Sequence, residues 1–218
     1  MPFLFKNIHA FLLLLTLAFS VVGNAQISEW ESGEIKVQEK DSNYVRELLS
    51  RAEELRFSNP DSSKIISRRA IEVSEELDYV DGLARGLKNI GIIEFDMGNY
   101  FMADDYYQKS LSIYERAGDT LGMSNLLSNL GSNYQTLGND PKALEYFTRS
   151  LRYAQIVEDP KRIGVAYVNI GTVYSNDEAT YDVAIENYEK SIHFFEQIDY
   201  FLGLTVVNLN IGEMHLIS

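Results

Sequence analysis

The sequence predicts an all-α fold, an α-solenoid of stacked antiparallel helix pairs, over residues 42–218. Three observations predict it: a short motif returns at an almost constant spacing, apolar residues recur three or four positions apart, and Gly, Asn, Asp and Pro cluster where each helix is expected to end. The composition agrees, because 45% of the 218 residues are apolar, as in a domain with a core. The chain has no cysteine, which excludes disulfides, thiolate nucleophiles and cysteine metal sites.

Residues 42–218 divide into repeats. The Gly of the motif Asn-x-Gly lies at positions 91, 131, 171 and 212, which are 40, 40 and 41 residues apart. After each of the first three, an Ala follows at a distance of 12 or 13 residues, and an aromatic residue comes four positions after that Ala. The small residues should let paired helices approach, and the aromatic residue should fill the space beyond them. These structural positions are Gly91, Ala103, Tyr107, Gly131, Ala143, Phe147, Gly171, Ala184 and Tyr188.

Each unit is predicted to contain two helices. In the clearest unit the first helix covers residues 121–136, Gly138 ends it, and Asp140-Pro141 begins a second helix that runs to residue 157. The expected units are about 42–80, which is degenerate and caps the array, then 81–118, 119–158 and 159–198, and a partial unit 199–218; a flexible polar linker over residues 26–41 precedes them. The apolar residues of 202–217 have no second helix to cover them, so we expect the natural protein to continue beyond Ser218.

Residues 1–25 are predicted to be a signal peptide. Lys6 supplies the positive start, residues 8–22 are apolar, and Gly23-Asn24-Ala25 places small residues at a cleavage site, so the mature chain would begin at Gln26. Retention as a membrane anchor is the weaker alternative, because a membrane-spanning helix needs about 20 apolar residues. We therefore expect an exported protein, periplasmic or extracytoplasmic, with no membrane span in the mature segment.

The chain is acidic. It has 32 Asp and Glu against 19 Lys and Arg, a formal net charge of −13. Surfaces that bind nucleic acid need clustered basic residues, so we expect no nucleic acid partner for this segment. An acidic surface favours basic or neutral partners over acidic ones.

The spacing L-G-x-x-Y followed by A-x-x-x-F resembles the tetratricopeptide repeat, and it recurs over nearly all of the chain after Asp41. This resemblance implies a right-handed superhelix in which the first helix of each unit lines a concave face that binds an extended peptide or a partner protein. The period near 40, rather than about 34, and the absence of the usual Pro late in the second helix resemble the longer-repeat branch of the family. Some members hold an acidic C-terminus in a carboxylate clamp, which needs a Lys, an Asn four residues later, and basic residues in the first helix of the third unit. Here the residue four positions after Lys88 is Ile92, and the later basic positions hold Val165 and Asn169, so the clamp is incomplete.

The Asn of the repeated motif is the main candidate for ligand binding. Asn89, Asn129, Asn169 and Asn210 would form a ladder on the concave face, and an Asn amide can donate to and accept from a peptide group. The alternative is that each Asn bonds a neighbouring helix and fixes the stacking register. Both interpretations stay open. Further candidates on these helices are Arg85, Lys88 and Gln135.

No pattern in the sequence predicts an enzyme, a metal site or a cofactor. His193 and His215 have no recognised metal or triad spacing, and the acidic stretch 176–182 is better explained as a solvated turn than as a calcium loop. Two functions remain. The chain is either an exported scaffold that binds a protein or peptide, or, by resemblance to bacterial membrane signalling proteins, the extracytoplasmic sensor region of a longer protein with a histidine kinase, nucleotide cyclase or helix-turn-helix output domain.

Overall fold

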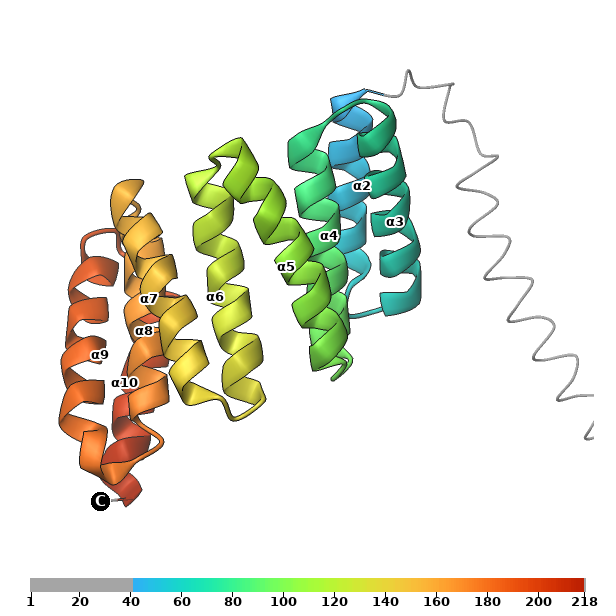
Figure 1. Ribbon diagram of the computed structural model, residues 1–218. Coiled ribbons are helices and arrows are strands. Elements are labelled where there is room, and N and C mark those ends of the chain that lie inside the picture. Colours follow the sequence, from blue (N-terminus) through green and yellow to red (C-terminus); the bar gives the residue numbers. More distant parts are fainter. Residues whose placement is uncertain (1–40, 218) are drawn as a thin grey trace, which may run out of the picture. The chain divides into compact units, whose positions relative to one another are not determined.

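The computed structural model describes residues 41–217, and side chains as far as Met214. The predicted signal peptide 1–25 and all of the predicted linker 26–41 except Asp41 lie outside the described residues. Every described helix belongs to the unit Ser42–Ser218. The helices are α2 (Ser42–Leu55), α3 (Pro60–Glu76), α4 (Val80–Asp96), α5 (Tyr100–Ala117), α6 (Thr120–Thr136), α7 (Asp140–Ile156), α8 (Pro160–Tyr174), the short 3-10 helix η1 (Glu178–Thr180), α9 (Tyr181–Glu196) and α10 (Phe201–Ile217) (Figure 1).

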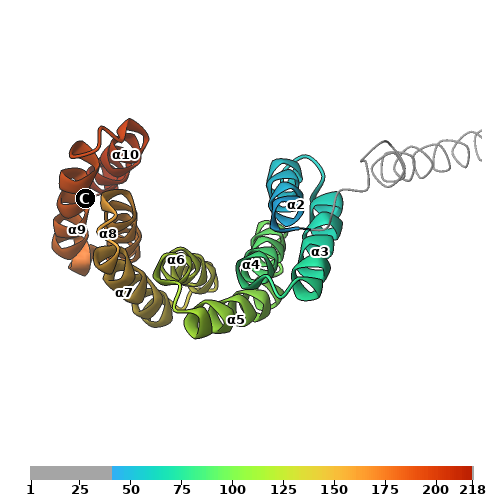
Figure 2. The ribbon, with the colours of Figure 1, turned by 90° about the horizontal axis from the view of Figure 1, so that it is seen from above.

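The predicted all-α solenoid is confirmed within the described range, where no strand is present. Each helix contacts the next one along the chain, and the first helices of successive units also contact one another, in the order α2, α4, α6, α8 and α10. Figure 2 shows these five helices along the inner side of the curved row, with α3, α5, α7 and α9 along its outer side. The first helix of each unit therefore lines the concave face, as expected.

The helix pairs are held together by a Gly on one helix and an aromatic ring on the other. A Cβ added to Gly91 would lie 2.5 Å from the Tyr107 ring, and one added to Gly131 would lie 2.4 Å from the Phe147 ring. Gly171 meets Tyr188 at 2.7 Å in the same way. The missing side chain thus leaves the space that the ring fills.

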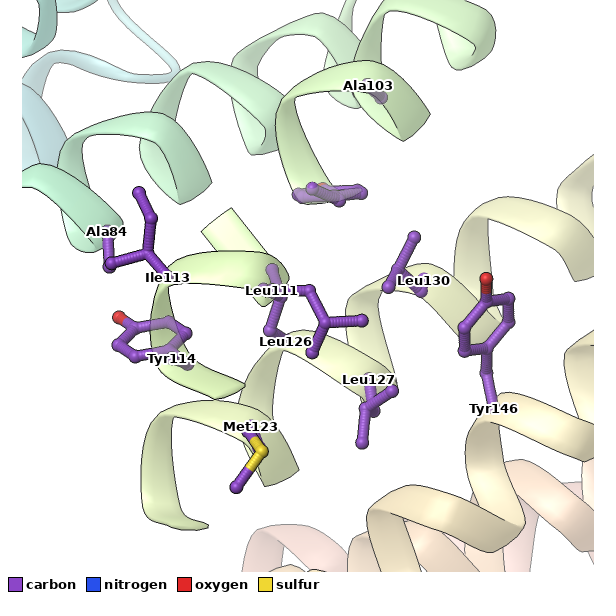
Figure 3. Packing of buried hydrophobic residues seen from close by; sticks show 11 residues of the cluster. Ala84, Ala103, Leu111, Ile113, Tyr114, Met123, Leu126, Leu127, Leu130 and Tyr146 are labelled. Carbon is purple, nitrogen blue, oxygen red and sulfur yellow. The ribbon is translucent and has the colours of Figure 1, made fainter. Parts of the chain in front are cut away.

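The repeated spacing of small residues continues on the second helices. Ala103, Ala143 and Ala184 are fully buried, as predicted for residues at a helix crossing. Between the pairs, the core passes without a break from α4 to α7, where buried Leu, Ile, Met and Tyr side chains pack together (Figure 3).

Several helices are followed by a residue whose backbone is in the left-handed region. The acidic residues near the helix ends fall into two groups, of which only one has this conformation. Gly98, Gly118 and Gly138 have φ of +80°, +67° and +72°, while Asp78, Glu158 and Asp199 adopt the same region with φ of +52°. An L-residue with a side chain is strained there, although Asp tolerates it better than most. Asp119 and Asp159 act differently, because they cap α6 and α8 by accepting hydrogen bonds from the backbone N–H groups of Gly122 and Arg162.

The last described helix carries an apolar surface that faces solvent. Phe201, Leu202 and Leu209 of α10 are 73%, 65% and 61% exposed. Gly212, which occupies the same repeat position as Gly131, has no atom within 4 Å of an added Cβ. Among the described residues α10 therefore lacks the aromatic partner that the preceding units possess. None of the helices between residues 41 and 217 combines the length and hydrophobicity needed to cross a membrane.

Candidate functional site

Two adjoining grooves lie mainly between the first helices of the units. The first has a volume of about 490 Å³ and the second about 360 Å³. The first is lined by Lys88, Ile92, Ser124, Asn125, Ser128, Asn129, Ser150, Lys161, Arg162 and Val165. The second is lined by Ala52, Glu53, Arg56, Ser63, Lys88, Asn89, Ile92 and Ile93. Most of these residues come from α2, α4, α6 and α8, the helices that lie along the inner side of the row in Figure 2.

Lys88 and Ile92 line both grooves, so they mark the place where the two meet. Lys88 makes no hydrogen bond and no ion pair with any described residue. Burial lowers the pKa of Lys88; the positive charges of Arg85 and Arg162 lower it further, while Glu53 and Asp81 oppose the shift. The site therefore holds a partly desolvated cation that lacks a directly bonded anion.

Two members of the Asn series bond a neighbouring helix. The Nδ2 of Asn169 on α8 donates to the Ser128 Oγ on α6 over 3.0 Å, and the Nδ2 of Asn210 on α10 lies 3.5 Å from the Thr172 Oγ1 on α8. These contacts join the first helices of successive units. They correspond to the interpretation in which the Asn fixes the stacking register.

The other two members line the grooves and have free side-chain donors. Asn89 is only 5% exposed, and its Nδ2 has no hydrogen-bond partner among the described residues. Asn129 is half-buried, and within the described part of the chain its side chain forms no hydrogen bond either. Ser128 lies 41 residues before Asn169, and the same spacing places Lys88 before Asn129 and Leu48 before Asn89. At the sequence position that Ser128 occupies for Asn169, these two amides thus have a leucine, which offers no acceptor, and a lysine, whose ammonium only donates.

The remaining candidates from the sequence lie outside the grooves. Arg85 on α4 has ion-pair contacts of 3.7 Å with Glu53 and 3.9 Å with Asp81. Gln135 is half-buried near the end of α6, and it lines neither groove. The structure therefore brings together Lys88, Asn89 and Asn129 but not these two residues.

Arg162 is a groove residue that the sequence pattern did not single out as a candidate. Its position in the repeat is occupied by Gly82, Gly122 and Gly203 in the other units. Added Cβ atoms at these glycines would collide with Ser74, Tyr114 and Phe195 of the preceding second helix. In the unit of Arg162 the corresponding residue is the smaller Ala154, which is fully buried, so a large side chain fits there. The interrupted glycine series was the signal in the sequence that marked this position.

The Arg162 side chain reaches from α8 towards α6. Its Nε donates to the Asn125 Oδ1 over 3.0 Å, and its Nη1 pairs with the Asp159 carboxylate. Nearby, the Nζ of Lys161 lies 4.5 Å from the centre of the Tyr200 ring. Arg162 and Lys161 thus supply two more cations to the first groove, one of them paired with a carboxylate and one placed over an aromatic face.

Few features of the described residues suggest catalysis or metal binding. Among residues 41–217, no three His, Asp or Glu side chains gather so as to hold a metal ion. His193 is exposed, and the side chain of His215 lies outside the described residues. Residues 176–177 form an exposed turn before η1, and Asp177 caps η1 by accepting a hydrogen bond from the N–H of Ala179. The buried Glu94 has a structural environment, since it receives hydrogen bonds from Lys64 and from Asn99.

Comparisons with known proteins agree with this architecture. Residues 82–156 match the tetratricopeptide repeat family model, whereas no curated protein sequence matches the chain. Aspartyl phosphate phosphatase F from Bacillus subtilis aligns with a TM-score of 0.72, 18% identity, and coverage of 77% of this chain and 44% of that one. A signal transduction ATPase with numerous domains from Pyrococcus horikoshii, which has a tetratricopeptide repeat sensor, aligns with a TM-score of 0.71, 18% identity, and coverage of 88% and 30%.

A third similar structure is the Rap protein complexed with competence and sporulation factor, with a TM-score of 0.58, 15% identity, and coverage of 83% of this chain and 54% of that one. At these identities the likeness shows the fold alone. The chain spans less than half of the first two structures. Residues 82–156 thus match the tetratricopeptide repeat model, and the Gly and aromatic pairs and stacked helix pairs of the other described units follow the same repeat pattern.

Proposed function

We propose that the protein is a binding scaffold whose two inner grooves hold an extended peptide or a segment of a partner protein. The observation that carries this proposal is a set of unpartnered polar groups in the grooves: the ammonium of Lys88, which lines both, the amide of Asn129 in the first and the amide of Asn89 in the second. The tetratricopeptide fold is typical of protein-binding scaffolds, which agrees with this use of the concave face.

The energetic reason concerns the buried amide of Asn89. A buried donor without a partner costs about 1–3 kcal/mol, and a protein retains it only if something offsets that cost. An extended peptide presents a carbonyl oxygen at every residue, so its backbone can accept from Asn89 and Asn129 whatever its side chains are. A bound peptide would thus satisfy groups that the folded chain leaves without partners.

Selection of peptides from a random display library against the full 218-residue chain tests the proposal. The peptides obtained should bind the Asn129→Ala and Asn89→Ala variants about 10-fold more weakly than the parent, as expected for loss of one good hydrogen bond. Asn176→Ala is the matched control, because Asn176 is exposed in a turn and lines neither groove. Peptides that bind all four proteins equally well would contradict binding in the grooves.

A second candidate function is the extracytoplasmic sensor region of a longer membrane signalling protein. It is supported by the predicted signal peptide over residues 1–25 and by the exposed apolar residues of α10, which a further helix would cover. N-terminal sequencing of the protein recovered from outside the cytoplasm should give Gln26 first. The coding region downstream of Ser218 should then contain an apolar run of about 20 residues, and a stop codon there would refute the sensor proposal.

A further inference from the structure

We propose that the first groove takes an acidic side chain within an extended peptide, with the carboxylate placed at Lys88 and flanked by Lys161 and Arg162. The inference rests on the proposed function, and it names the chemistry of the ligand. It also reverses, for this surface, the expectation from net charge that the partner is basic or neutral.

The charge of the first groove is opposite to that of the chain. Three of its lining residues are basic and none is acidic, although the chain has 32 acidic and 19 basic residues. Arg162 is paired with Asp159, which does not line the groove, and Lys161 lies over the Tyr200 ring. Lys88 keeps its capacity to bind an anion, since no described carboxylate is within ion-pair distance of it.

A carboxylate between α4 and α8 would remove an unfavourable interaction. Burial lowers the pKa of Lys88, and the charge of Arg162 adds to this shift from the other side of the groove. Desolvation is the main cause of this shift, so a carboxylate beside the Lys88 ammonium would offset the cost of its partly buried charge. Hydrogen bonds between an ammonium and a carboxylate are also roughly twice as strong as those between neutral groups.

The position of Lys88 favours an acidic residue inside a peptide over a small anion or a chain end. Lys88 and Ile92 line both grooves, so a ligand bound there has further groove on each side. Asn89 lines the second groove, and its Nδ2 is a donor without a partner among the described residues, so a rotation of this side chain towards the groove would let it donate to a backbone carbonyl of the same peptide. On the other side, the amide of Asn129 offers the next contact.

Titration of the full chain with blocked peptides tests the inference. The probes are hexa-glutamate and hexa-glutamine, both acetylated and amidated at their ends, and sodium acetate. Two-dimensional ¹H–¹⁵N NMR follows the side-chain amides of Asn89 and Asn129. Hexa-glutamate should bind at least about 10-fold more tightly than hexa-glutamine, in keeping with one charge-assisted hydrogen bond.

Two variants locate the effect. Lys88→Met should abolish the preference for hexa-glutamate, and Lys190→Met should preserve it. Lys190 is the matched control, because it is exposed on α9, pairs with Glu186 and lines neither groove, so its loss changes the net charge equally. A thermal melt of each variant confirms that it is folded.

The outcomes separate this inference from the function on which it rests. Equal binding of the two peptides, or failure of hexa-glutamate to bind a protein that still binds display-selected peptides, would overturn the acidic preference and leave the scaffold function intact. If acetate produced the same shifts at the same carboxylate concentration, the groove would be a small-anion site and the peptide inference would be wrong. If Lys88→Met kept the preference, the assignment to this residue would fail.

Discussion

The close packing of Gly131 against Phe147 makes Gly131→Ala the sharpest test of the repeat architecture. An added Cβ would lie 2.4 Å from Cδ1 and Cε1 of Phe147 and 2.9 Å from its Cγ. The ring is fully buried, so it cannot move aside into solvent. The helices must therefore separate, or the ring must leave its preferred rotamer.

The expected magnitude is the difference of two effects. Overpacking of a buried core costs about 1–3 kcal/mol, while replacement of a helical Gly by Ala gains about 1 kcal/mol from helix propensity. Gly212 has the same place in its repeat, but nothing lies within 4 Å of its added Cβ. Gly212→Ala should thus keep the gain without the overpacking cost, and the two variants should differ in their free energy of unfolding by about 1–3 kcal/mol.

Urea unfolding followed by circular dichroism of the full chain measures this difference. Adding Phe147→Leu to Gly131→Ala should recover part of the loss, with a coupling energy above about 0.5 kcal/mol, because a smaller side chain leaves room for the new methyl group. If Gly131→Ala were as stable as Gly212→Ala, the glycines would not serve close packing and the reasoning would be refuted.

Four further results are expected. Ala143→Leu should cost about 1–3 kcal/mol by overpacking at the helix crossing, and a thermal melt equal to that of the parent would contradict this. Asn169→Ala should cost about 1 kcal/mol in urea unfolding because a bond between α8 and α6 is lost, and an unchanged midpoint would rule out its role in the register. Lys88→Met should stabilise the fold at neutral pH, because the lowered pKa of Lys88 means that folding disfavours its charge. This gain in unfolding free energy should shrink as the pH rises towards 10.5, where the lysine also becomes neutral in the unfolded chain. A gain that stays constant with pH would argue against desolvation. Burial opposes ionisation of Glu94, but its hydrogen bonds with Lys64 and Asn99 lower its pKa. Lys64→Met should therefore cost about 3 kcal/mol of unfolding free energy at neutral pH, and less in acid, where the parent also loses the charge of Glu94. An equal cost at both pH values would count against this ion pair.

The repeat positions were predictable because packing of helix pairs depends on local spacing. Gly131 and Phe147 are 16 residues apart in adjacent antiparallel helices, and the same short connection brings Gly91 to Tyr107. Residues close in the chain can meet in few ways, so the periodicity already implies the contact. The end of α6 before Gly138 and the start of α7 at Asp140 were predictable for the same local reason, since turn and cap residues act on their immediate neighbours.

The candidate site was only partly predictable. Four Asn residues share one repeat position, yet Asn169 and Asn210 bond the next helix while Asn89 and Asn129 do not. The difference arises from the residue on the neighbouring first helix, about 40 positions earlier, and no local pattern announces it. Arg162 was not predicted, because its role depends on the hydrogen bond that its side chain donates to Asn125 on the neighbouring helix α6.

The sequence by itself determined the all-α class, the period of the repeat and the pairing of Gly with an aromatic ring, because these follow from steric fit between helices adjacent in the chain. The tertiary structure decided which polar groups lack partners. Stacking of successive units places Ser128 within hydrogen-bond distance of Asn169, and it gathers Lys88, Lys161 and Arg162 around one groove of an acidic chain. Hydrogen bonding and charge act through space between these units, so only their three-dimensional arrangement reveals where the chain leaves binding capacity unused.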